Sequence, residues 1–371
     1  KSPGWRVSGK GQSIMRHDAL QATSLDKSKF IISTELASAQ PDDRLDVGIE
    51  AEAEADAEVE VRALRIGADL HGMRLDRALA NLVPEFSRNY LQQLIDLGAV
   101  VFNGQAVRKP SQKVRAGEAG EISLRPTPQS QAFLPEAMAL DVVYEDSHLW
   151  VIHKPAGLVV HPAPGNWRGT LLNGLLARDP LSAQLPRAGI VHRLDKDTSG
   201  LMVVARSRVA MEALTRAIAQ REVGRKYLAL GHKPWTGPRS RQVETAIGRD
   251  PHYRLRMATV DLATQSGKTA STQLELLQAA EQGCWVRATL QTGRTHQIRV
   301  HMASVGHPLV ADVLYGGAPA AGLTRQALHA YQLAFAHPVT GKPLVFHAEL
   351  PPDLQQALAL WGLRYNGVER L

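Results

Sequence analysis

Short apolar or alternating runs, each bounded by turn residues, fill most of the chain from Ala139 onward. Such runs are typical of β-strands, and stretches with apolar residues at helical spacing separate them. The expected strands are LDVVYED, HLWVIHKP, GLVVHP, GIVHRLD, GLMVVA, KYLALG, STQLELLQ and CWVRATLQT. The expected helices are TLLNGLLARD, RVAMEALTRAIAQRE, HQIRVHMASVG and DLQQALALWGL. Because the two kinds alternate irregularly, the pattern predicts an α+β domain with a mixed, mainly antiparallel sheet, and not a doubly wound one.

The net charge of +7 is unevenly distributed: residues 1–40 carry +3, residues 41–60 carry −8 and residues 61–371 carry +12. Residues 1–60 show no sustained periodicity, so we expect a mostly disordered, partly acidic tail. The basic charge of residues 61–371 favours a polyanionic partner, either nucleic acid or a membrane surface. An equally good alternative is a solvated basic surface that only aids solubility.

Several classes of protein are disfavoured. The single Cys284 can form neither an intrachain disulfide nor a Cys-based zinc site. No apolar run of ~18 residues and no signal segment is present, so we expect a reducing, cytoplasmic location and no membrane partner. No GxGxxG follows an expected strand and no GxxxxGK[ST] occurs, so a nucleotide cofactor is not expected.

Residues 61–125 have the pattern of a small separate module. VRALRI alternates like a strand, MRLDRALANLVPEF and SRNYLQQLIDLGAVVFNG carry helical spacing, and Ser87 suits a helix N-cap. AVVFNGQAV then reads as a tight hairpin with an Asn-Gly turn. A linker over residues 126–138 separates this module from the domain expected over residues 139–371.

The succession RLDRAL, SR, LGAVVFNG, a lysine at 113 and AGE resembles an S4 domain, a small RNA-binding module. The resemblance implies RNA contact through four basic residues of the module: Arg74, Arg88, Lys109 and Lys113. The alternative is ordinary solubilising surface charge.

An aspartate stands between two basic residues in GIVHRLDKDTSG, residues 189–200. If the strand runs on to Asp195, Arg193 shares its face with Cα atoms ~6.6 Å apart, whereas His192 points to the other face. At a strand end Asp195 can protrude into a cleft and act in catalysis. The alternative is an aspartate that bonds the turn backbone.

Two further segments carry polar groups at junctions between elements. WVRATLQTGRTHQIRVHMASVG reads as a strand, a turn and a helix that begins at Thr295 as N-cap, with Ile298 on its apolar face. Arg294 sits at the corner between strand and helix. In RKYLALG, Tyr227 lies amid apolar residues.

Together these segments strongly resemble the RluA-type pseudouridine synthases. VHRLDKDTSGLMV, RKYLAL and LQTGRTHQIRVHM carry the resemblance, with HKPAGLVVHP, GTLLNGLL and RQALHAYQLAFAHPVTGKP beside them. It spans roughly residues 139–350. With an S4-like module in front, the nearest type within the family is the one that acts on large-subunit ribosomal RNA. The resemblance implies a catalytic domain with a central cleft that isomerises uridine in RNA without metal or organic cofactor.

The resemblance also implies roles for single residues. Asp195 matches the catalytic aspartate, acting as a nucleophile at the sugar or by taking a proton from it. Arg294 matches the arginine that pairs with this aspartate and keeps it ionised, and Tyr227 matches the aromatic residue that lies against the base and can shuttle a proton.

Four residues are counted as substrate-binding: Arg193, His192, Lys154 and Ile298. Arg193 matches a residue that fills the stack vacated when the target nucleotide flips out, and a phosphate contact or a structural salt bridge is its alternative. For His192, core packing or an orienting hydrogen bond is favoured. The expected partner is RNA, as large-subunit ribosomal RNA or a precursor of that subunit, and the chain is expected to be a monomer.

Two positions depart from the family pattern: His153 stands where an asparagine is frequent, and Ala311 stands where a glycine is expected. Two other functions compete. A metal hydrolase is disfavoured, because His296 and His301 lie five residues apart with no glutamate between them. An RNA-binding assembly protein with an inert large domain is opposed by the Asp195, Tyr227 and Arg294 set.

Overall fold

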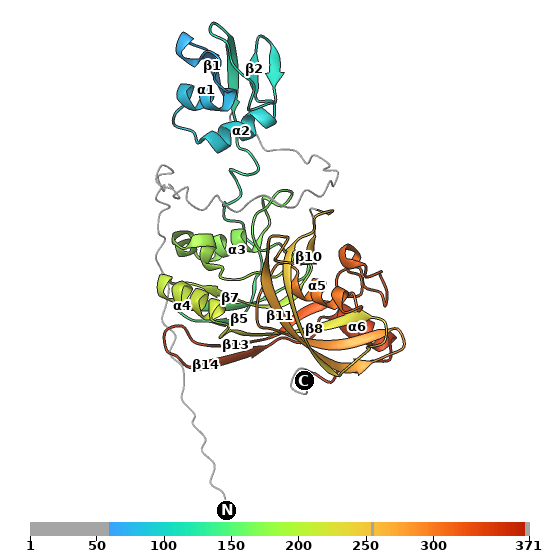
Figure 1. Cartoon of the computed structure of the whole chain (residues 1–371). Helices are drawn as coiled ribbons and strands as arrows, with labels where there is room; N and C mark the ends of the chain where they lie inside the picture. Colours follow the sequence, from blue (N-terminus) through green and yellow to red (C-terminus); the bar gives the residue numbers. More distant parts are fainter. Residues whose placement is uncertain (1–58, 254–255, 368–371) are drawn as a thin grey trace, which may run out of the picture. The chain divides into compact units, whose positions relative to one another are not determined.

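The computed structural model describes residues 59–253 and 256–367 (Figure 1). The expected acidic tail, residues 1–60, lies outside this part of the chain except for its last two residues. No helix of the described residues is long and apolar enough to cross a membrane.

The first part of the described chain forms a four-stranded antiparallel sheet in the order β1–β4–β2–β3. Its strands are β1 (Glu60–Arg65), β2 (Val100–Phe102), β3 (Gln105–Val107) and β4 (Ala119–Leu124). A short 3₁₀ turn η3 (Ala68–Leu70) and the helices α1 (Leu75–Leu82) and α2 (Arg88–Asp96) complete it. The β2–β3 turn uses Asn103 and Gly104, both at positive φ as a tight hairpin requires. The predicted N-cap is confirmed, because the Ser87 side chain accepts from the Tyr90 N–H at 3.3 Å.

The second part is built on a ten-stranded sheet with the order β10–β9–β11–β12–β8–β13–β7–β6–β5, and β14 pairs with β13. Its strands in chain order are β5 (Asp141–Glu145), β6 (Leu149–Lys154), β7 (Ser199–Ala205), β8 (Gly224–His232), β9 (Ser240–Arg249), β10 (Met257–Val260), β11 (Gly267–Ala279), β12 (Gly283–Leu290), β13 (Leu328–Ala336) and β14 (Pro343–His347). Its α-helices are α3 (Leu171–Arg178), α4 (Arg208–Ala219), α5 (Gln297–Ser304) and α6 (Pro352–Leu360), with 3₁₀ turns η4 (Pro180–Gln184), η5 (Pro186–Gly189) and η6 (Val313–Tyr315). The prediction of a mixed, mainly antiparallel sheet is confirmed.

Helices cover both faces of this sheet, which explains why its middle strands are apolar throughout. In β7 every residue is buried, and successive residues pack into different clusters. Met202 and Val204 join a cluster that includes residues of α3 and α5, whereas Leu201 and Val203 pack with residues of α4.

Strand β8 divides its side chains in the same way. Tyr227 and Ala229 join the cluster that includes Ile298 of α5, and Leu228 and Leu230 pack with α6 on the opposite face. The face of the sheet that carries α3 and α5 is therefore also the face on which Tyr227 lies.

Strands β7 and β13 form a parallel pair, through Ser199 opposite His329 and Gly200 opposite Ala330. Gly200 has φ +120°, and a Cβ there would lie 2.2 Å from the Ala330 carbonyl oxygen. The close approach of the two backbones thus requires a glycine at this position.

Three local predictions are wrong. GLVVHP forms no strand. GIVHRLD is irregular apart from a single bridge between Ile190 and Val204, because Arg187, Ala188 and Gly189 all take positive φ and turn the backbone out of an extended path. Helix α5 has His296 as N-cap, not Thr295.

Candidate active site

Backbone contacts hold the loop that carries Asp195. The Lys196 carbonyl accepts from the Lys154 ammonium at 2.8 Å and from the Gly157 N–H at 2.9 Å. The Asp197 carbonyl accepts from Arg325 at 2.9 Å. Because each anchor comes from another part of the chain, the irregular loop has a defined place at the start of β7.

The Asp195 carboxylate contacts two side chains from the start of α5. Its Oδ2 accepts from Arg299 Nη1 at 3.2 Å, and its Oδ1 lies 3.9 Å from His296 Nε2. The Asp195 side chain is 18% exposed, so solvent or substrate can reach it.

Burial alone would raise the pKa of Asp195, but His296, Arg299 and the nearby Arg193 lower it below its ordinary value of 3.8. Burial lowers the pKa of His296, so this imidazole is neutral at neutral pH. The contact that keeps a positive charge beside the Asp195 carboxylate at neutral pH is therefore the one with Arg299. Asp195 is an ionised carboxylate at neutral pH.

Arg299 lies at the centre of this set. Its Nε and Nη2 donate to the two carboxylate oxygens of Asp312, each at 2.8 Å, while Nη1 turns to Asp195. The Tyr315 ring lies 4.9 Å from the guanidinium carbon. The Tyr315 hydroxyl contacts His296 Nδ1 at 2.8 Å. Tyr315 thus links Arg299 and His296, the two side chains that face Asp195.

The start of α5 is fixed by the buried Gln297. Its amide donates to the Ser271 carbonyl at 3.0 Å and to the Thr272 hydroxyl at 2.8 Å, and its Oε1 accepts from the Arg294 N–H at 3.0 Å. His296, just before the helix, has φ 55°, a conformation that costs free energy for a non-glycine residue. The surrounding hydrogen bonds hold it there, with its ring toward Asp195.

Tyr227 lies on β8, 6% exposed, on the same face of the sheet. Burial raises its pKa, and the negative charge of Asp195 raises it further against the opposing effect of Arg225. The phenol is therefore protonated at neutral pH, and an aromatic ring with a proton to give lies near the carboxylate.

The expected pairing of Arg294 with Asp195 is wrong. Arg294 Nε donates to the Thr269 carbonyl at 3.2 Å, and among the described residues the arginine in contact with Asp195 is Arg299. Arg294 lies before the helix and Arg299 on its first turn, where the side chain turns inward. A catalytic role of Arg294 other than this pairing is not tested by the structure.

The four expected substrate-binding residues occupy different environments. Arg193 is exposed, as a residue that reaches RNA must be. Ile298 is 4% exposed and belongs to the core. His192 accepts from the Val203 N–H at 3.0 Å, which agrees with the expected orienting hydrogen bond, and burial lowers its pKa to about 3.

Lys154 is fully buried, and its ammonium donates to the carbonyls of Pro155, Leu158 and Lys196 at 2.8 to 2.9 Å. Burial lowers its pKa to about 7. All three donors are therefore used within the protein, and Lys154 positions the Asp195 loop instead of contacting substrate directly.

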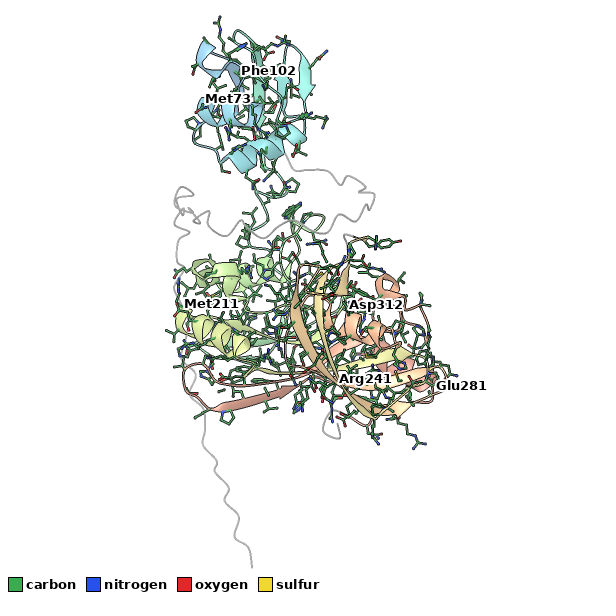
Figure 2. The ribbon with its side chains drawn as sticks, viewed as in Figure 1. Met73, Phe102, Met211, Arg241, Glu281 and Asp312 are labelled. Carbon is green, nitrogen blue, oxygen red and sulfur yellow. The ribbon has the colours of Figure 1, made fainter. Side chains whose placement is uncertain are left out.

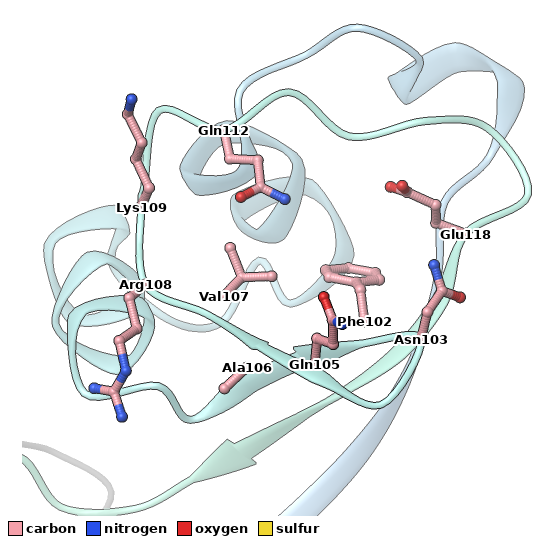
Figure 3. Close-up of a pocket in the computed structure, with 9 residues that line it drawn as sticks. All are labelled: Phe102, Asn103, Gln105, Ala106, Val107, Arg108, Lys109, Gln112 and Glu118. Atoms are coloured by element: carbon pink, nitrogen blue, oxygen red, sulfur yellow. The ribbon is translucent and has the colours of Figure 1, made fainter.

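The four basic residues of the small module divide into two kinds. Arg74 and Arg88 contact the fully buried Asp76, at 3.1 Å and 2.5 Å, and help to lower its pKa against the effect of burial. Lys109 and Lys113 are exposed. Lys109 is one of nine residues between Phe102 and Glu118 that line a surface pocket (Figure 3).

The structure shows the surroundings of the two positions that depart from the family pattern. His153 Nδ1 contacts the Asp141 carboxylate at 3.0 Å across the β5–β6 pair. Ala311 has φ 60°, the left-handed conformation for which glycine is preferred, which explains the glycine expected there.

Among residues 59–253 and 256–367, no group of three His, Cys, Asp or Glu side chains could hold a metal ion. His301, named in the metal-hydrolase alternative, contacts the hydroxyls of Thr272 and Thr245 at 2.8 Å and 3.0 Å. Its role in the described structure is to join α5 to β11 and β9.

The arrangement combines an ionised, partly exposed carboxylate, an arginine that stabilises it, and a protonated phenol. A carboxylate in this state can attack an electrophilic carbon or accept a proton. Asp312, Tyr315 and His296 were not part of the expected site. Asp312 and Tyr315 follow α5 in the segment PLVADVLYG. Nothing in the sequence pattern of this segment indicates that these two polar residues lie in a buried cluster.

Comparison with known proteins places both parts of the chain. A family model described as RNA pseudouridylate synthase matches residues 148–304, and an S4 domain model matches residues 73–119. The ribosomal large subunit pseudouridine synthase D of Neisseria meningitidis serogroup B is 47% identical over 310 residues, covering 80% of this chain and 81% of that relative. The protein of the same description from Nitrosomonas europaea is 45% identical over 318 residues, covering 83% and 90%.

Among solved structures, human RNA Pseudouridylate Synthase Domain Containing 1 matches 67% of this chain and 95% of its own, with a TM-score of 0.49 and 24% identity. The family assignment rests on the sequence relatives, because they are 45–47% identical to this chain and cover at least 80% of it. The chain belongs to the RNA pseudouridine synthases and is an enzyme of that family with an S4 domain.

Proposed function

We propose that the enzyme isomerises specific uridines of large-subunit (23S) ribosomal RNA, within a stem-loop, with Asp195 as the catalytic carboxylate. The observation that carries the proposal is the ionised, 18% exposed Asp195 held at 3.2 Å by Arg299 of α5, the helix that packs on the same face of the sheet as Tyr227. The relatives named for the large ribosomal subunit, at 47% and 45% identity, support this choice of RNA.

In the proposed reaction the bond between C1′ of the ribose and N1 of uracil breaks, the base turns, and C1′ bonds to C5. The proton of C5 is lost and N1 gains one, so the product is an isomer and the reaction has no net oxidation. A redox cofactor is therefore not required by the balance, and we expect no metal or organic cofactor.

Asp195 acts at the ribose in one of two ways, as a nucleophile or as a base that takes a proton from the sugar. Both need the ionised form that Arg299 stabilises. Tyr227 lies against the base and is suited to pass a proton, because burial keeps its phenol protonated.

A stacked uracil cannot reach a carboxylate in a folded domain, so the target nucleotide is expected to flip out, at a cost of a few kcal/mol. The exposed Arg193, two residues before Asp195, is suited to fill the vacated place. The S4 domain, with its exposed Lys109 and Lys113, supplies further affinity for the RNA backbone. Deletion of residues 61–125 should then weaken RNA binding while chemistry persists on saturating substrate. We expect a monomer in the cytoplasm.

The test is pseudouridine mapping, by carbodiimide adducts and reverse transcription, on ribosomal RNA from cells with and without the protein. Stops should disappear at specific large-subunit positions without it and return with the wild-type chain but not with Asp195→Asn. The matched control is Asp261→Asn, a carboxylate of the β10–β11 turn that accepts from the Ala263 N–H at 2.9 Å. Unchanged stops at every large-subunit position in cells that lack the protein would contradict the proposed substrate.

A further inference from the structure

Asp312 is a buried carboxylate whose hydrogen bonds go to neither Asp195 nor Tyr227. Its side chain is 1% exposed and lies near α5 (labelled in Figure 2). Ionised groups are rarely buried so completely without a specific partner. The partner is Arg299, which donates to both carboxylate oxygens at 2.8 Å.

The geometry of this pair determines where the rest of the guanidinium points. A guanidinium is planar, and two parallel hydrogen bonds along one edge fix its orientation. Because Nε and Nη2 of Arg299 are occupied by Asp312, Nη1 is the nitrogen left for Asp195, at 3.2 Å. A guanidinium held by Asp195 alone would be free to turn about this single contact.

Tyr315 restricts the same group from a second direction. Its ring lies 4.9 Å from the guanidinium carbon, and its hydroxyl accepts from the Met257 N–H at 2.9 Å and contacts His296 Nδ1 at 2.8 Å. The edge of Arg299 is thus fixed by Asp312 and one face is covered by Tyr315.

The backbone that carries Asp312 is itself firmly placed. The Asp312 carbonyl accepts from the N–H groups of Tyr315 and Gly317 at 3.0 Å and 2.9 Å, and its own N–H donates to Leu309 at 3.1 Å. Ala311 before it is held at φ 60°, an unfavourable conformation for a non-glycine residue. The turn therefore keeps an unfavourable backbone conformation at the residue before this carboxylate.

We propose that Asp312 is a positioning residue for the isomerisation, acting through Arg299 by directing Nη1 toward the Asp195 carboxylate. The inference rests on the proposed role of Asp195. It assigns Asp312 no contact with the RNA, so removal of its carboxylate should slow the chemical step and leave RNA binding unchanged.

The test is a double-mutant cycle with Asp312→Asn, Arg299→Lys and the two together. The readouts are tritium release from large-subunit ribosomal RNA transcribed with [5-³H]uridine, in single turnover with saturating enzyme, and the Kd for the same RNA. Asp312→Asn should slow release about 100-fold, the effect of misplacing a catalytic group by roughly 1 Å, with Kd within about threefold. In the Arg299→Lys background it should change the rate less than about threefold, because there is no planar guanidinium left to direct.

The matched control is Glu275→Gln, which weakens the contact of Glu275 with Arg287 on β11 and β12. It should leave the rate within about threefold of the wild type. If Asp312→Asn does not fold, Asp312→Glu keeps the charge but displaces the guanidinium, and it should slow release about tenfold.

Three results would overturn the proposal. They are an undiminished rate in the folded Asp312 variants, a decrease of the same size in the Arg299→Lys background, and an effect confined to Kd. Failure of the wild-type chain to release tritium would instead contradict the proposed function, so the two failures are distinguishable.

Discussion

Arg299 and Asp195 lie 104 positions apart in the chain and meet at 3.2 Å in the fold. The contact joins the first turn of α5 to the irregular loop before β7. Because Arg299 helps to lower the pKa of Asp195 against the effect of burial, this pair sets the protonation state on which the proposed chemistry depends.

The acidic limit of activity should follow from this pKa. An aspartate whose pKa is below 3.8 stays ionised as the pH falls from 8 to 5, so the single-turnover rate should not decline in that range through Asp195. Arg299→Met removes one of the positive groups that oppose the effect of burial, and it should therefore raise the pKa of Asp195 and move the acidic limb of the rate profile upward. Rates measured at saturating enzyme between pH 5 and 8 test this. An identical profile for Arg299→Met, with folding checked by circular dichroism, would contradict it.

The two properties of Tyr227 should be separable. Tyr227→Phe keeps the ring and removes the hydroxyl, so RNA affinity should hold within a few-fold while the chemical step slows by about 10²- to 10⁴-fold, the usual contribution of a proton-transferring group. Tyr227→Leu also removes the aromatic ring and should weaken binding in addition. Single-turnover rates and Kd values for both variants measure this. A wild-type rate for the Phe variant would exclude the proton-transfer role.

Lys154 should matter for folding before chemistry. Lys154→Met is close in length but leaves the carbonyls of Pro155, Leu158 and Lys196 without this donor. Unsatisfied buried polar groups cost about 1–3 kcal/mol each, and partial relaxation should give a net destabilisation of about 3 kcal/mol. Urea unfolding measures the free energy of unfolding. The single-turnover rate of the folded fraction should also fall, because the Lys196 carbonyl keeps only one of its two donors, the Gly157 N–H. Wild-type stability and rate together would rule out the positioning role.

The basic residues of the S4 domain should respond differently to removal. Lys109→Ala and Lys113→Ala should each weaken RNA binding modestly and reduce the slope of log Kd against log salt by about one for each phosphate that is no longer neutralised. Arg88→Ala should also destabilise the domain, by about 1–2 kcal/mol, because the buried Asp76 loses one partner and keeps Arg74 and Gln92. Filter binding at several salt concentrations and thermal unfolding distinguish the two kinds. Equal effects on stability from both would contradict the division.

The large domain should become less stable in mild acid. His301 and His329 are fully buried, and burial lowers their pKa values to about 4 from 6.5. Between pH 6.5 and 4 the unfolded chain binds more protons, so stability falls as the pH drops through this window, by about 1.4 kcal/mol per pH unit for each histidine.

Urea unfolding followed by tryptophan fluorescence measures this, because the described tryptophans all follow Ala139. His329→Gln should flatten the pH dependence. Its amide can donate to the Ala348 carbonyl and accept from Ser199, the two partners of His329, without titrating. A pH-independent stability of the wild type between pH 6.5 and 5 would contradict the prediction.

The irregular succession of short apolar runs and helical stretches is sufficient to predict the class of fold. The middle strands are buried on both faces, so they consist almost wholly of apolar residues and can be recognised as strands. The path before Asp195 is not predictable in this way. GIVHRLD has the composition of a strand, but left-handed backbone at Arg187 and Ala188 depends on the packing of Gly189 against β7, where a Cβ would lie 1.9 Å from the Ala205 carbonyl.

The arginine that pairs with Asp195 is hidden from sequence reasoning for a related cause. Helix α5 is buried on nearly all sides from Gln297 to Met302, so its polar residues do not follow an exposed face and periodicity cannot show where Arg299 points. Arg294, in contrast, stands at a visible corner of the pattern. Only the partners Asp195 and Asp312, remote in sequence, identify the arginine of the site.

The parallel pairing of Ser199 with His329 has a consequence for the order of events during synthesis. The sheet and core of the S4 domain are complete by Leu124, whereas β13, the strand that pairs in parallel with β7, begins only at Leu328. Domains fold as units while the chain emerges, beginning with the N-terminal one. A growing chain therefore completes its S4 domain long before the sheet that carries the proposed catalytic site, so the RNA contacts expected of this domain can form before the proposed chemistry begins.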